Sequence, residues 1–172
     1  MASLMENLIQ CLEAQHDAYS KLVELSKQKT PIIVSGTLEE LQRITDEEQL
    51  AVNKVNEIDR ERSEIMKDIA NVINRDVSEL RLTDLVSLIN GRPDEQTKLE
   101  EARKRLVEVG KELKTVNERN KELLENALEM VNFDLTLIQS MKQAPQMGNY
   151  NRGAINTGEV YGTNLKGFDA KQ

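Results

Sequence analysis

Few side chains in this sequence could perform chemistry. His16 is the only histidine and Cys11 the only cysteine, so no multi-histidine metal site is possible and only one Cys/His pair exists. These two residues are five apart on a predicted helix, a spacing at which side chains do not face each other well. We expect Cys11 to be a small core residue and His16 to lie at the surface or at the edge of a helix seam. A phosphotransfer histidine on a four-helix bundle is the alternative for His16, but no basic, glycine-bearing segment surrounds it.

Other catalytic motifs are missing from the sequence. It has no P-loop, no GxGxxG and no CxxC, the patterns that mark phosphate, dinucleotide and dithiol chemistry. The acidic pairs Glu47–Glu48 and Glu100–Glu101 fall on predicted helix faces, where carboxylates are normally solvated. The sequence therefore predicts that the protein is not an enzyme and that it binds no metal and no cofactor.

Composition indicates long helices with narrow apolar seams. The chain has 172 residues, of which 38% are hydrophobic, 31% charged and only 3% aromatic, whereas a thick globular core usually contains more aromatic volume. A net charge of −7 argues against nucleic acid and against an anionic membrane surface as partners. No apolar run approaches the ~20 residues of a membrane span, and the first residues do not resemble a signal peptide. With a single cysteine, we expect a cytoplasmic protein.

Apolar residues at alternating steps of four and three predict three long helices. The first spans residues 4–33 and ends at Gly36. The second runs from about Leu38 to Asn74, with Thr37 and Glu40 placed as a capping box at its start. A connection this short makes the first two helices antiparallel neighbours. Within the seam of the second helix, Glu48 and Arg62 are polar, and polar seam residues more often set the register than perform chemistry.

The remaining elements follow from similar signals. A short apolar helix capped by Thr83 and running to Asn90 is expected in the second connection, and Gly91 ends it. Pro93 suits the first position of a helix, and the third long helix then runs to about Gln143. The predicted fold class is all-α: an elongated antiparallel helical bundle or coiled coil of three long helices, with a short helix in the second connection and a flexible C-terminal tail.

The end of the third helix is apolar over most of its circumference. One stripe continues the bundle seam through Leu123, Ala127, Met130, Leu137 and Met141. A second stripe consists of Leu124, Leu128, Val131, Leu135 and Ile138, and Phe133 in the same segment is a further candidate for binding a partner. A helix that is apolar on so many sides must be covered from more than one side, and the rest of the chain looks able to cover only one. We therefore predict that the second stripe binds another protein, the alternative being that it packs against the chain's own hairpin or tail.

Residues 144–172 differ from the helical part. They contain five of the eight glycines and three of the five aromatic residues. We expect residues 1–143 to form a helical domain and the glycine-rich tail to be disordered alone. The aromatic residues are candidate anchors for a partner or for the second stripe: Tyr150, Tyr161 and Phe168.

The order of these parts resembles the FlgN family of flagellar type III export chaperones. The similar segments are LMENLIQCLEAQHDAYSKLVELSKQK at the start, SGTLEELQRITDEEQ at the hairpin, NEIDRERSEIMKDIA in the second helix and NERNKELLENALEMVNFDLTLIQ in the last. The tail motifs YNRG, TGEVYG and FDAKQ are similar as well. The resemblance spans essentially the whole chain, although each motif alone has low specificity because long helices resemble one another.

The resemblance implies a cytoplasmic chaperone for the hook-filament junction proteins FlgK and FlgL. Members of this family bind the C-terminal helical segments of these substrates, prevent premature assembly and deliver them to the export gate. The family's substrate-binding element is the last amphipathic helix, which here corresponds to the second stripe. The tail could then shield this stripe until substrate displaces it, or dock on the export gate.

Two other functions remain open from the residues alone. A structural coiled-coil protein could use the second stripe as a homodimer seam. An adaptor of another secretion system would share every feature except the substrate.

Overall fold

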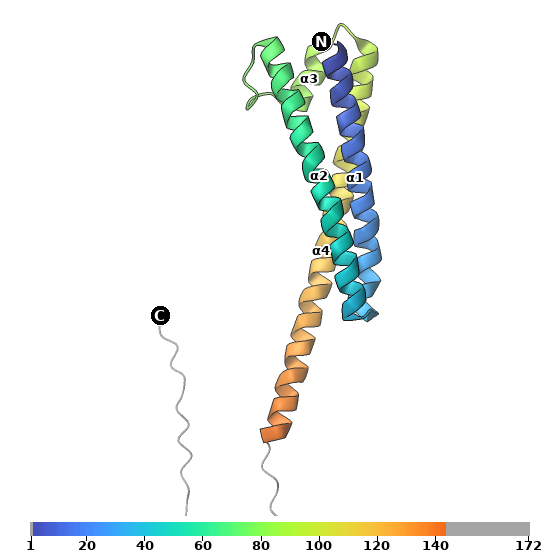
Figure 1. Cartoon of the computed structure of the whole chain (residues 1–172), viewed down its shortest axis with the longest axis vertical. Coiled ribbons are helices and arrows are strands. Elements are labelled where there is room, and N and C mark those ends of the chain that lie inside the picture. Colours follow the sequence, from blue (N-terminus) through green and yellow to red (C-terminus); the bar gives the residue numbers. More distant parts are fainter. Residues whose placement is uncertain (1, 144–172) are drawn as a thin grey trace, which may run out of the picture.

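The computed structural model describes residues 2–143, which form four helices (Figure 1). These are α1 (Ala2–Ser35), α2 (Leu38–Ile73), α3 (Leu82–Leu88) and α4 (Pro93–Gln143). The chain descends through α1, returns through α2 and descends again through α4, so α2 runs antiparallel to the other two long helices. The prediction of an all-α fold with three long helices and a short one in the second connection is confirmed.

Local sequence signals fix the hairpin between α1 and α2. At the start of α2, the Thr37 hydroxyl accepts the Glu40 N–H at 3.2 Å, and the Glu40 carboxylate accepts the Thr37 N–H at 2.8 Å, which is the predicted capping box. These hydrogen bonds hold the pKa of Glu40 below its usual value. A Cβ atom on Gly36 would lie 2.6 Å from the Ile32 carbonyl oxygen. Only glycine therefore fits at this turn without a shift of the backbone.

The connection from α2 to α4 differs in detail from the prediction. Asn74 follows α2 in the left-handed conformation, with φ 53°, which asparagine tolerates better than most residues. The short helix begins at Leu82, so the expected cap at Thr83 is wrong and Thr83 lies inside α3. The reason is the Asp84 carboxylate, which accepts the Arg81 N–H at 2.9 Å and so starts the helix two residues earlier.

Two apolar clusters form the core, and α1 contributes to both. The first lies where α3 closes the end of the bundle and includes Leu8, Leu12, Ile69, Leu85 and Leu99. The second lies nearer the hairpin and includes Leu22, Leu25, Ile44, Ala51 and Val55, with Leu113 of α4 packed against it. Both α2 and α4 pack along α1, so α1 is the central helix of the fold.

A polar layer separates the two clusters. Gln15 of α1 is buried, and its amide contacts two residues of α2. Its Nε2 donates to Asp59 Oδ1 at 3.2 Å, and its Oε1 accepts from Arg62 Nη1 at 3.2 Å. Arg62 also pairs with Asp59 at 2.7 Å. Mispairing α1 and α2 would break these bonds, which fits the register role expected for Arg62.

A second polar layer, the Asn120 network, joins α1, α2 and α4 beside the hairpin. The Asn120 amide accepts from the Thr30 hydroxyl and donates to the Ser26 carbonyl, both at 2.7 Å. The Ser26 hydroxyl lies 2.9 Å from a Glu48 oxygen and 3.0 Å from Asn117 Oδ1. Lys29 completes the network by pairing with the other Glu48 oxygen at 2.6 Å. Because Ser26 and Asn120 are buried, these bonds are shielded from water and fix α4 along α1.

We predict that Asn120→Ala lowers the free energy of unfolding by about 1–3 kcal/mol, because it leaves the Thr30 hydroxyl and the Ser26 carbonyl without their buried partner. Chemical denaturation followed by circular dichroism measures the change. The matched control is Asn126→Ala, the same substitution on the same helix at an exposed position, which should shift stability by no more than about 0.5 kcal/mol. Equal effects of the two variants would show that the network does not hold α4.

A second prediction concerns the capping box at the start of α2. Thr37→Ala should destabilise the protein by about 1 kcal/mol, because the Glu40 N–H loses its acceptor. The stability that Glu40 contributes should be fully present above the pKa that this carboxyl has in the unfolded chain. It should be lost as the pH falls through the lower pKa that the carboxyl has in the folded protein. Denaturation at neutral and acidic pH tests both statements. Thr45→Ala, inside α2 and exposed, is the control and should not destabilise.

Candidate binding surface on the last helix

The attachment of α4 to the bundle ends well before the helix does. Asn120 is the last buried residue of α4, and Leu123, Leu124 and Ala127 are half-buried. Every residue from Leu128 to Gln143 is exposed. Figure 1 shows the reason, since this part of α4 extends past the turn of the α1–α2 hairpin. We call residues 128–143 the α4 tip.

The residues predicted to bind substrate lie on or next to this tip. Leu128, Val131, Leu135 and Ile138 are about half exposed or more, and Phe133 is 67% exposed. Leu124 differs from them, because it lies one turn earlier and is half-buried. Apart from Leu124, the second stripe therefore projects from the bundle without cover from any other described residue.

The first stripe does not continue the bundle seam as the sequence predicted. Met130 and Met141 are each 70% exposed and Leu137 is 48% exposed. This expectation was wrong because the hairpin that would cover these residues has already turned back at Gly36. The tip therefore presents both apolar stripes, on adjoining sides of one helix.

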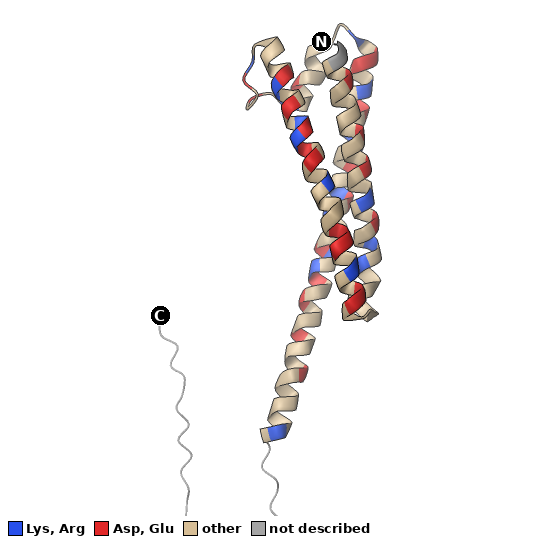
Figure 2. Cartoon of the chain, in the orientation of Figure 1, with Lys and Arg blue, Asp and Glu red and all other residues tan. Residues whose placement is uncertain are grey.

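The tip also differs from the bundle in charge. Charged residues occur along all the long helices of the bundle but become sparse toward the end of α4 (Figure 2). Within the tip the charged residues are Glu129, Asp134 and Lys142. A helix with wide apolar faces and few charges is suited to hydrophobic packing against another helix.

The residues that could have performed chemistry lie elsewhere and do not meet. Cys11 is buried in the core, and its thiol donates to the Ile58 carbonyl at 3.6 Å. Burial, with smaller contributions from the Glu61 and Asp59 carboxylates, raises the pKa of the thiol, so it is a poor nucleophile. His16 instead lies 3.2 Å from the carboxylate of Asp17. Among residues 2–143, no group of three or more His, Cys, Asp or Glu side chains is placed to hold a metal ion.

Comparison with protein families identifies the chain. Residues 1–157 match the family model described as FlgN protein. The chain belongs to the FlgN family. No curated protein and no solved structure matches it.

Family membership establishes the general function. FlgN proteins are flagellar export chaperones for hook-associated proteins and are not enzymes, so the predictions of family and of a non-enzymatic protein are confirmed. The family also implies FlgK and FlgL as binding partners. None of the helices between residues 2 and 143 is long and apolar enough to cross a membrane. The candidate tail anchors Tyr150, Tyr161 and Phe168 lie outside the described residues.

The exposure of the tip leads to a third prediction. Backbone amides of residues 128–143 should exchange with solvent much faster than those of residues 99–120, because no packed side chains stabilise the helix there. Hydrogen exchange of the isolated protein, followed by mass spectrometry, compares the two segments within one molecule. Equal protection would mean that the tip is covered in solution, by a second copy or by the tail.

Proposed function

We propose that the α4 tip is the surface on which this chaperone binds the C-terminal helical segments of FlgK and FlgL. The observation that carries the proposal is the exposure of every residue from Leu128 to Gln143 on a helix with two apolar stripes. Axial proteins of a flagellum assemble through helical ends that pair with one another. A chaperone that offers a substitute apolar helix keeps those ends from pairing early.

The size of the stripe suits reversible binding. Burying the four exposed aliphatic residues of the second stripe contributes about 6–12 kcal/mol gross, at about 1.5–3 kcal/mol for each side chain. Loss of translational and rotational freedom costs about 4–15 kcal/mol, and ordering a flexible substrate segment adds to that cost. These costs offset most of the gain from the second stripe, so any net affinity is moderate at most, which suits a chaperone that must release its cargo.

The same geometry is compatible with delivery of the bound substrate to the export gate. The proposed site occupies one end of the molecule, while the bundle carries the charged surface and the α3 end. A substrate helix on the tip leaves that surface free to contact the export gate. We infer that the chaperone works in the cytoplasm, where the substrates are held before export.

We predict that Leu128→Asp or Val131→Asp weakens binding of a FlgK C-terminal fragment by at least about 100-fold, because a carboxylate would have to be buried in the apolar interface. Helicity and melting temperature should be almost unchanged, since both positions are exposed. Isothermal titration calorimetry and circular dichroism measure the two effects.

Two kinds of control make this experiment decisive. Thr136→Asp places the same charge on the polar side of the tip and should leave binding nearly unchanged. Leu113→Asp, in the second core cluster, should lower the melting temperature. If Val131→Asp unfolds the protein, the stripe is part of a core. If sedimentation shows a dimer that the same variant dissociates, the stripe is a homodimer seam instead.

A further inference from the structure

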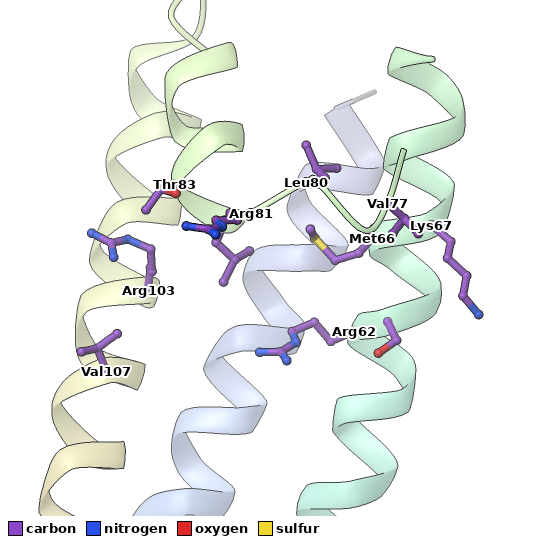
Figure 3. A pocket seen from close by; sticks show the side chains of 11 residues that line it. Arg62, Met66, Lys67, Val77, Leu80, Arg81, Thr83, Arg103 and Val107 are labelled. Atoms are coloured by element: carbon purple, nitrogen blue, oxygen red, sulfur yellow. The ribbon is translucent and has the colours of Figure 1, made fainter. Parts of the chain in front are cut away.

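A groove with a volume of about 720 Å³ lies between α2 and α4, under the chain that leads from α2 into α3 (Figure 3). Met66 of α2, Leu80 of the connection and Val107 of α4 are among its apolar lining residues. Its size is in the range of ordinary ligand sites, about 300–1,000 Å³. The groove therefore has room for several side chains of a partner.

The charge of the groove is opposite to that of the protein. Its lining includes four cationic residues and no carboxylate: Arg62, Lys67, Arg81 and Arg103. The whole chain has a net charge of −7. A cluster of this sign attracts anionic groups to one place on a molecule that otherwise repels them.

Two of the four cations are already neutralised. Arg62 pairs with Asp59 and Lys67 with Glu64, each at 2.7 Å, and Lys67 extends away from the groove (Figure 3). Arg81 and Arg103 are not paired with any carboxylate of the described residues. Two acidic residues are near Arg81 in the chain. Glu79 makes no ion pair with it, and Asp84 accepts its backbone N–H rather than pairing with its guanidinium.

The two unpaired arginines both line the groove, on neighbouring parts of its wall. Arg81 reaches from the α2–α3 connection toward α4, which carries Arg103 (Figure 3). The Nε atom of Arg103 is buried and has no hydrogen-bond acceptor within residues 2–143. A buried donor left without an acceptor is costly, so Arg103 gains a hydrogen bond if its guanidinium shifts to meet a partner's carboxylate.

We propose that this groove binds an acidic, amphipathic segment of a partner protein. Its carboxylates pair with Arg81 and Arg103, whose planar guanidinium groups accept carboxylates in a bidentate geometry. Its apolar side chains pack against Met66, Leu80 and Val107. Nucleic acid fits less well, because the groove has no aromatic side chain for stacking bases and the surrounding protein is acidic.

The groove is separate from the proposed substrate surface. Arg103 and Leu128 are 25 positions apart on one continuous helix, a distance of about 38 Å at 1.5 Å per residue. A partner in the groove and a helix on the α4 tip can therefore bind at the same time. The inference goes beyond the proposed function and does not require it.

A defined probe tests the groove directly. The probe is a fluorescein-labelled peptide in which two Glu residues alternate with two Leu residues. The full-length protein is titrated into the peptide at low ionic strength, and binding is followed by the fluorescence anisotropy of the label. We expect saturable binding that weakens as salt is added. The double variant Arg81→Gln/Arg103→Gln should bind at least about tenfold more weakly, since it loses both charged hydrogen-bond donors. A peptide with Gln in place of Glu should bind the unmodified protein as weakly as the Glu peptide binds the double variant. This comparison does not depend on the folding of any variant.

Matched variants separate this site from other surfaces. Arg43→Gln/Arg119→Gln removes the same charge from two exposed positions outside the groove and should leave peptide binding unchanged. Val131→Asp should also leave it unchanged, so failure of this inference can be told apart from failure of the proposed substrate surface. The inference is overturned if the Glu peptide does not bind, or if Val131→Asp abolishes its binding. It is also overturned if the Arg81/Arg103 variant binds the Glu peptide as tightly as the unmodified protein does, or if the Gln peptide binds as tightly as the Glu peptide. Tighter binding of a single-stranded oligonucleotide in the groove would overturn it as well.

Discussion

The hydrogen bonds of Asn120 are the last buried attachment between α4 and the hairpin. They connect its amide to the hydroxyl of Thr30 and to the carbonyl of Ser26, and no residue of α4 beyond Asn120 is buried among those that the structure describes. A polar residue is useful here because an apolar seam tolerates sliding by a heptad, whereas buried hydrogen bonds are satisfied in one register only. The Asn120 network therefore determines where α4 leaves the bundle and which residues project beyond it.

The projecting part of α4 has to remain helical without tertiary contacts. Starting a helix is unfavourable, but extending one is not, and the packed segment before residue 128 provides the start. Nine of the sixteen residues of the tip are good helix formers, mainly Leu, Met and Gln. A free peptide of the same sequence would lack that preformed start and would be a weaker helix.

Sequence periodicity predicted the helices well because α2 and α4 each have an apolar seam that packs along the central helix α1. The capping box at Thr37 and Glu40 also followed from residue types alone, since both partners lie within one turn. Periodicity did not predict where the bundle ends. The seam pattern runs on through Met130, Leu137 and Met141, and an apolar face has the same spacing whether its own chain or another protein covers it.

Two other features depend on residues that are distant in sequence. The groove combines arginines from α2, the connection and α4, and each of them alone resembles an ordinary surface residue. Only the fold shows that Arg81 and Arg103 have no carboxylate partner among the described residues, whereas Arg62 pairs with Asp59. The start of α3 depends on the Asp84 carboxylate, which accepts the N–H of the N-cap residue Arg81, and residue preferences alone favoured a cap at Thr83 instead.

The length of the hairpin has a consequence for how much of α4 other proteins can reach. α1 has 34 residues and α4 has 51, a difference of about 25 Å at 1.5 Å per residue. The turn at Gly36 is therefore a boundary that divides α4 into a covered and an uncovered part. Adding two heptads to both α1 and α2 would move that boundary by about 21 Å, close to the end of α4, and would cover one side of the tip without altering any residue of it. In this architecture the reach of the hairpin, as much as the composition of the last helix, determines how large a surface is offered.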